Sequence, residues 1–173
     1  MLVNNGTVIS NNLIGLDVYR MEIETSIARE VQCGQFVQVQ VPGFFLRRPI
    51  SVSEKLDDKR IVLIYKKVGE GTEVMTHLKK NDDVSLFGPL GTGFPVEERD
   101  VLLIGGGVGV PPLVETAKQY RARGRKVTAV LGFNTVHDAI LVERLEQLGV
   151  KTFIATMDGS YGTNGTVMDA ITA

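Results

Sequence analysis

The pattern of apolar and polar positions in the first part of the chain is that of β-strands. Residues 36–41 alternate strictly between apolar and polar side chains and stop at Pro42-Gly43. Residues 61–65 form an unbroken apolar run, which is typical of a strand buried on both faces. Further short strands are predicted at residues 7–10, 18–23 and 84–87. Several short strands at this spacing favour a sandwich or a barrel.

A single helix is predicted within this β-rich part, at residues 71–80. Thr72 is a suitable N-cap residue, and Asn81 stands where the helix would end.

From about residue 97 onward the pattern changes to strands that alternate with helices. Strands are predicted at residues 101–104, 127–133 and 152–156, and helices at residues 111–123 and 137–148. Pro111 and Pro112 suit the first turn of a helix, where proline costs no hydrogen bond, and Gly124 and Gly149 stand where the two helices end. This order is the beginning of a doubly wound parallel sheet.

We therefore predict two domains, an all-β domain at residues 1–97 and an α/β domain at residues 98–173. Three strands are fewer than a doubly wound sheet usually has. We expect the second domain to be incomplete and the chain to be a fragment of a longer protein.

Composition and charge narrow the class of protein. The net charge is -1, without the basic excess that nucleic-acid binding usually needs. The one cysteine, Cys33, fits a reducing compartment. The sequence shows neither a signal peptide nor an apolar run approaching the ~20 residues of a transmembrane helix. We expect a cytoplasmic protein that binds neither nucleic acid nor membrane.

A glycine-rich loop connects the strand at residues 101–104 to the helix that follows it. The loop consists of Gly105, Gly106, Gly107, Val108 and Gly109. Glycines let a backbone approach a phosphate closely, and the helix N-terminus supplies unpaired N–H groups and a positive dipole end. The spacing differs from the G-x-G-x-x-G fingerprint, and the alternative is a tight structural turn.

Two adjacent arginines, Arg47 and Arg48, precede Pro49, Ile50 and Ser51. A guanidinium binds a pyrophosphate with two parallel hydrogen bonds, and the Ser51 hydroxyl is a donor for a polar ring atom. The alternative is a pair of surface arginines at the end of a strand.

A third candidate follows the apolar run, at Ile64, Tyr65 and Lys66. The Tyr65 ring is suited to stacking on a flat ligand, and the backbone N–H groups of Gly71 and Thr72 at the helix start are suited to a phosphate. The alternative is an ordinary capped helix.

Together these segments resemble the ferredoxin–NADP reductase superfamily. Residues 48–51 are similar to its R-x-[YFI]-[ST] flavin motif, residues 105–109 to its nicotinamide-domain loop, and residues 88–94 to its G-P-x-G-x-x-F segment. Within the superfamily, residues 105–113 and 158–165 most resemble the electron-transfer subunits of heteromeric dihydroorotate dehydrogenases. The resemblance covers nearly the whole chain, in the order and spacing of the family.

The resemblance implies a six-stranded antiparallel β-barrel that binds FAD, followed by an α/β domain that binds NAD. FAD would be held by Arg48, Pro49, Ile50, Ser51, Ile64, Tyr65, Lys66, Gly71 and Thr72. NAD would be held by Gly105, Gly106, Gly107, Val108, Gly109, Asp158, Gly159 and Ser160. No catalytic side chain is predicted, because the flavin performs the chemistry.

The implied partner is a catalytic FMN-containing subunit that oxidises dihydroorotate to orotate in pyrimidine biosynthesis. Electrons would pass between NAD and FAD by hydride transfer, and between FAD and FMN through a [2Fe-2S] cluster. Members of the family bind this cluster with four cysteines, whereas this chain has only Cys33. It has no ligands for the cluster, which is consistent with a truncated chain. We predict no metal site, since His77 and His137 lack metal-ligand spacing.

Two alternatives remain open at this point. One is a flavin subunit of the same superfamily, from a sulfide dehydrogenase or an NADH-dependent ferredoxin:NADP oxidoreductase. The other is a degenerate barrel that acts only as an interaction module. The preference for NAD over NADP is also open, because the basic residues 123–126 lie about 20 residues past the glycine loop and would suit a 2′-phosphate.

Overall fold

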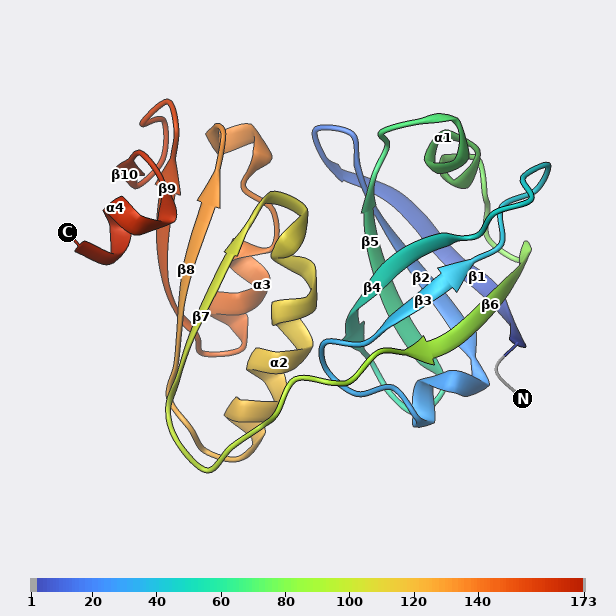
Figure 1. The fold of residues 1–173 in the computed structure, drawn as a ribbon, viewed down its shortest axis with the longest axis horizontal. Helices are drawn as coiled ribbons and strands as arrows, with labels where there is room; N and C mark the ends of the chain where they lie inside the picture. Colours follow the sequence, from blue (N-terminus) through green and yellow to red (C-terminus); the bar gives the residue numbers. More distant parts are fainter. Residues whose placement is uncertain (1–2, 173) are drawn as a thin grey trace. The chain divides into compact units, whose positions relative to one another are not determined.

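The computed structural model describes residues 3–172. The chain divides into two compact units, Met1–Phe94 and Pro95–Ala173, the first rich in strands and the second mixed (Figure 1).

The first unit is a closed six-stranded barrel, as predicted. Its strands are β1 (Val3–Gly15), β2 (Val18–Thr25), β3 (Phe36–Val39), β4 (Arg48–Lys55), β5 (Arg60–Lys66) and β6 (Asp83–Leu90). They close in the order β1-β2-β5-β4-β3-β6, with every neighbouring pair antiparallel. A short 3₁₀ turn, Ser26–Arg29, follows β2.

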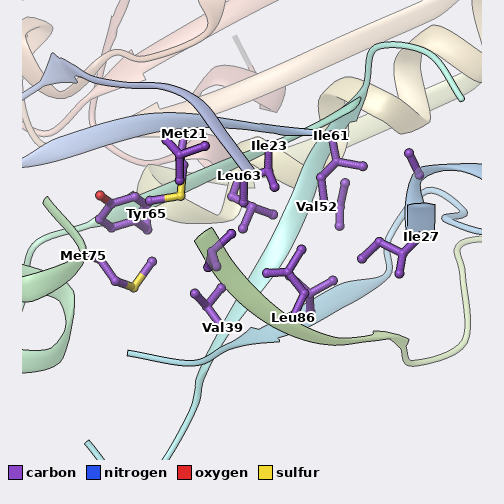
Figure 2. Packing of buried hydrophobic residues seen from close by; sticks show 14 of the residues in the cluster. Met21, Ile23, Ile27, Val39, Val52, Ile61, Leu63, Tyr65, Met75 and Leu86 are labelled. Carbon is purple, nitrogen blue, oxygen red and sulfur yellow. The ribbon is translucent and has the colours of Figure 1, made fainter. Parts of the chain in front are cut away.

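The barrel interior is filled by alternate residues of the strands. From β5 these are Ile61, Leu63 and Tyr65, which join Met21 and Leu86 in one buried cluster (Figure 2). The intervening residues of the apolar run are buried as well, so its prediction as a strand buried on both faces is confirmed.

The helix of the barrel unit is shorter than predicted. Helix α1 spans Glu70–Thr76, and its N-cap is Gly69 rather than Thr72, which lies at the third helical position. The helix ends early because the Asn11 side chain donates hydrogen bonds to the carbonyls of Met75 (2.9 Å) and Leu78 (3.1 Å). These carbonyls would otherwise need the partners that a longer helix provides.

The second unit is a four-stranded parallel sheet with helices on both faces. Its strands are β7 (Val101–Gly106), β8 (Val127–Phe133), β9 (Lys151–Thr156) and β10 (Thr163–Asn164), in the order β10-β9-β8-β7. Its helices are α2 (Pro111–Ala122), α3 (Val142–Gln147) and α4 (Val167–Thr172). Helices α2 and α3 lie on one face of the sheet and α4 on the other (Figure 1).

The predicted helix at residues 137–148 is wrong in its first half. Residues Val136–Asp138 form a 3₁₀ turn, and α3 begins only after Leu141, which adopts a left-handed backbone conformation. The turn is fixed by Asp138, whose carboxylate accepts hydrogen bonds from the backbone N–H (3.2 Å) and the hydroxyl (3.1 Å) of Thr135. Such local side-chain bonds compete with helix formation.

Helix α2 begins at Pro111, as predicted. The glycine loop begins later than expected, since Gly105 and Gly106 still belong to β7 and only Gly107–Gly109 form a 3₁₀ turn. Strand β10 and helix α4 were not predicted. Within residues 3–172, no helix is both long and apolar enough to cross a membrane.

Candidate functional site

A cavity of about 290 Å³ lies between the start of β4 and the start of α1. Its lining residues are Phe44, Arg48, Val68, Gly69, Glu70, Gly71 and Thr72. The cavity therefore joins Arg48 to Gly71 and Thr72, three of the residues predicted to bind FAD although they are far apart in the sequence.

The Arg48 side chain is held beside this cavity by three neighbours. Its Nη1 donates a hydrogen bond of 2.6 Å to the Leu46 carbonyl, and its Cζ lies 4.9 Å from the centre of the Phe44 ring. A Cβ atom at position 71 would collide with Nε of the guanidinium. Glycine at this position therefore allows the guanidinium to lie directly against the first turn of α1.

The first turn of α1, with Glu70, Gly71 and Thr72, lines the cavity. The Thr72 hydroxyl accepts hydrogen bonds from the backbone N–H of Val68 (2.9 Å) and Gly69 (3.1 Å) and donates one to the Gly69 carbonyl (2.9 Å). Because this hydroxyl is fully used, Gly71 and Thr72 can offer a ligand only their N–H groups, which lack partners in the helix. With the nearby arginine these groups suit an anion, although the exposed carboxylate of Glu70 also lines the cavity.

The next residues of β4 alternate between its two faces. The Ile50 side chain is half-buried and packs against the barrel core. Pro49 is exposed and Ser51 is half-buried, and by strand periodicity they share the opposite face.

The Tyr65 ring belongs to the barrel interior. It is 2% exposed, stacks on the Tyr19 ring with centroids 5.7 Å apart, and donates a hydrogen bond of 3.0 Å to Asn11 Oδ1. Burial raises the pKa of the Tyr65 hydroxyl to about 12. The ring is thus not available for the predicted stacking on a ligand, and among the neighbours Ile64 is also buried while Lys66 is half-buried.

Arg47 and Arg48 have different environments. Arg47 donates hydrogen bonds to the carbonyl of Ser85 (3.0 Å), the hydroxyl of Ser85 (3.1 Å) and the carbonyl of Gln38 (3.4 Å). Arg47 therefore ties together the backbone of the barrel, whereas Arg48 lines the cavity.

In the second unit, the five residues of the glycine loop differ in surroundings. A side chain at Gly105 would collide with Leu113, so that glycine serves packing. Gly107 has a φ of 50°, and a Cβ at Gly107 or Gly109 would meet no atom within 4 Å. Val108 is 54% exposed. The end of the loop is therefore open, and it leads directly into α2.

The second predicted NAD segment, Asp158, Gly159 and Ser160, follows β9. Asp158 Oδ1 accepts hydrogen bonds from Ser160 Oγ (2.6 Å) and Ser160 N (3.0 Å), and Ser160 Oγ accepts one from Val136 N (2.8 Å). The hydrogen bond from the Ser160 hydroxyl is the main cause that holds the pKa of the Asp158 carboxyl below its ordinary value.

Both segments predicted to bind NAD lie at the carboxyl edge of the sheet. Gly106 is paired with Gly132, and Gly132 with Ala155, so the three loops that follow these strands start at the same level. Open parallel sheets bind ligands at this edge.

The basic residues 123–126 lie at the other edge, directly before β8. Arg123 donates a hydrogen bond to the Val96 carbonyl, and Arg125 forms an ion pair with Glu98. Their position argues against the alternative that this run binds a 2′-phosphate.

The side chains of this chain do not fit a [2Fe-2S] cluster. Such a cluster needs four ligands, usually thiolates, and the sequence contains one cysteine. Cys33 is 2% exposed inside the first unit, with its thiol 3.5 Å from the Phe94 carbonyl. Across residues 3–172 there is no group of three or more His, Cys, Asp or Glu side chains placed to hold a metal ion.

Four residues that line the cavity were not predicted from the sequence as site residues: Phe44, Val68, Gly69 and Glu70. Phe44 lies four positions before Arg48, in a loop whose conformation the strand pattern does not determine. Strand periodicity could have placed the Tyr65 ring in the core, because Ile61, Leu63 and Tyr65 are alternate residues of one strand.

Curated relatives are similar to this chain along nearly all of its length. The dihydroorotate dehydrogenase B (NAD(+)) electron transfer subunit of Fusobacterium nucleatum subsp. nucleatum is 40% identical over 180 residues, covering 99% of this chain and 69% of that protein. The subunit of the same name from Geobacillus kaustophilus is 42% identical over 177 residues, covering 96% of this chain and 68% of that protein. No family model matches the chain.

Solved structures give the same fold. The chain superimposes on an NADH-dependent reduced ferredoxin-NADP oxidoreductase structure with a TM-score of 0.87 and 30% identity, covering 96% of this chain and 62% of that chain. A cytochrome P450 reductase from Amycolatopsis gives a TM-score of 0.84 and 26% identity, covering 95% of this chain and 55% of that chain.

The fold and the relatives confirm the resemblance found in the sequence, and the chain is an oxidoreductase subunit. It belongs to the family of electron transfer subunits of NAD(+)-dependent dihydroorotate dehydrogenase B, whose fold is that of ferredoxin–NADP reductases.

Proposed function

We propose that the barrel binds FAD and the α/β unit binds NAD(H), and that the chain passes electrons between these two cofactors. The observation that carries this proposal is the cavity at which the Arg48 guanidinium and the N-terminus of α1 meet. A pyrophosphate is the part of FAD that such a pair of groups would recognise.

In this proposal each barrel residue has a defined part. Arg48 donates to the pyrophosphate from the guanidinium, and the backbone N–H groups of Gly71 and Thr72 donate from the helix. Pro49, Ile50 and Ser51 line the ribityl chain and the ring. Ile64, Tyr65 and Lys66 contact FAD mainly through the backbone, because the side chains of Ile64 and Tyr65 are buried. When bound, FAD would supply hydride and single-electron chemistry.

On the α/β unit, the open end of the glycine loop would hold a phosphate of NAD. Gly107, Val108 and Gly109 leave room for it at the approach to the N-terminus of α2, while Gly105 and Gly106 position the loop. Asp158, Gly159 and Ser160 would bind another part of the dinucleotide at the same edge of the sheet.

The partner of this chain would be a catalytic FMN-containing subunit that oxidises dihydroorotate to orotate in pyrimidine biosynthesis. The names of the curated relatives support this partner. We place no dihydroorotate site on this chain. The single cysteine supports a reducing compartment, the cytoplasm.

Substitution of Arg48 tests the proposed function. Arg48→Ala should weaken FAD binding by about tenfold to a hundredfold, because it removes a charge-assisted hydrogen-bonding group from the pyrophosphate. Calorimetric titration of the purified chain with FAD measures the affinity.

Arg47→Ala is the matched control. It should lower stability in urea by about 1–3 kcal/mol, since it removes the hydrogen bonds to Ser85 and Gln38. Its effect on FAD affinity should be small. An Arg48→Ala variant that binds FAD as tightly as the wild type would rule out the proposed site.

A further inference from the structure

We infer that Phe44 positions the Arg48 guanidinium for the flavin pyrophosphate, so that the two side chains act as one unit in FAD binding. This inference rests on the proposed function and adds to it a residue outside the R-x-[YFI]-[ST] motif.

Phe44 is fixed to the barrel, whereas the two residues that follow it directly are exposed. Its N–H donates a hydrogen bond of 3.1 Å to the Val41 carbonyl, and its carbonyl accepts one of 2.8 Å from Gln40 Nε2. Its ring packs against the buried cluster of the barrel. By contrast, Phe45 is 97% exposed and Leu46 is 67% exposed. Phe44 is therefore anchored at the start of the segment that leads to Arg48, and the hydrogen bonds of Arg47 anchor its end.

The Phe44 ring restricts the position of the Arg48 guanidinium without occupying the hydrogen-bond donors of Arg48. The guanidinium carbon lies 4.9 Å from the ring centre, within the range of a cation–π contact. Of the five N–H donors of arginine, one on Nη1 is directed to the Leu46 carbonyl. The ring attracts the cation as a whole, so the remaining donors are left for a phosphate.

Pre-organisation is the physical reason for an effect on affinity. An arginine side chain in solution samples many rotamers, and ordering it on binding opposes association. Here the Phe44 ring and the backbone of Gly71 both lie close to the guanidinium and hold it beside the cavity before a ligand arrives.

A double-mutant cycle between Phe44 and Arg48 tests this inference. Phe44→Leu keeps an apolar side chain but removes the ring, and should weaken FAD binding by about two- to tenfold. Phe44→Tyr keeps the ring and should bind FAD nearly as the wild type does. In an Arg48→Met background, Phe44→Leu should weaken binding no further, because the group that it positions is gone.

The contact can also be measured without FAD. In the apoprotein, the Arg48 Nε–H resonance should carry a ring-current shift that Phe44→Tyr retains and Phe44→Leu removes. Urea unfolding of each variant shows whether the barrel is intact.

The outcomes separate the inference from the proposed function. If Phe44→Leu lowers FAD affinity equally in the wild-type and Arg48→Met backgrounds, the inference alone is overturned. An unchanged FAD affinity in the Phe44→Leu variant would also overturn it. An Arg48→Met variant with wild-type affinity for FAD would overturn the proposed function, and the inference with it.

Discussion

At the scale of single residues, the proposed FAD site depends on a missing side chain at position 71. Gly71 lies within α1, where glycine is less favourable than alanine by about 0.5–1 kcal/mol, yet a Cβ there would collide with the Arg48 guanidinium. Glycine at this position thus makes the helix less stable but leaves room for the Arg48 guanidinium.

Gly71→Ala should therefore change stability and binding in opposite directions. Stability of the apoprotein in urea should stay the same or rise by up to about 1 kcal/mol, because the helix improves and a flexible side chain can move away. FAD affinity should fall by about tenfold, because the guanidinium is displaced from the pyrophosphate. Combined with Arg48→Ala, Gly71→Ala should cost no further affinity, and an additive loss would contradict this explanation.

The sequence could predict the types of residue at this site but not the surroundings of each. Arg47 and Arg48 are adjacent and chemically identical, and only the fold shows that Arg47 is bound to Ser85 while Arg48 lines the cavity. Phe44 was missed because its effect on Arg48 arises from a loop conformation, which has no periodic pattern to reveal it.

At the scale of elements, the strands were predictable because their period is strong and local. Residues 127–133 were predicted as a strand and form β8 with the same bounds. The helix at residues 137–148 was mispredicted because the Thr135–Asp138 hydrogen bonds favour a turn over a helix with suitable apolar spacing. Strand β10 has two residues, too few for any pattern.

The packing of β5 in the barrel predicts a loss of stability at high pH. The pKa of Tyr65 is about 12 in the folded state against an ordinary value of 10.0, because the ionised form is disfavoured by burial. The unfolded chain therefore releases this proton at lower pH than the folded chain does. Protonated Tyr65 therefore contributes its full stabilisation of the folded state below pH 10. As the pH rises toward 12, the free energy of unfolding should fall by about 1–2 kcal/mol.

Urea unfolding of the wild type and a Tyr65→Phe variant measures this change in the free energy of unfolding. The measurement should run from about pH 9 to about pH 12, a range that includes both pKa values. The variant should be less stable at neutral pH, where the Asn11 side chain loses a partner, and the gap should narrow as the pH rises. Parallel pH profiles would show that Tyr65 does not titrate as its burial requires.

At the scale of the whole molecule, the proposed function requires both units. The residues proposed for FAD lie in the barrel unit, and those proposed for NAD lie in the α/β unit. The order of the motifs along the chain predicted FAD binding by the first unit and NAD binding by the second, although no single motif was specific for either cofactor.

By the proposed function, NADH bound at the glycine loop should reduce FAD bound to the barrel. The most direct measurement is anaerobic mixing of the FAD-loaded chain with NADH, with the visible absorbance of the flavin followed over time. Gly107→Val is the matched variant: its side chain would occupy the open space beside the loop, where φ is 50°, and would leave the FAD residues untouched. NADH should bleach the wild-type flavin, and the variant, at equal FAD content, should react at least about tenfold more slowly. A wild-type flavin that stays oxidised, or a variant that is reduced at the wild-type rate, would contradict the proposed function.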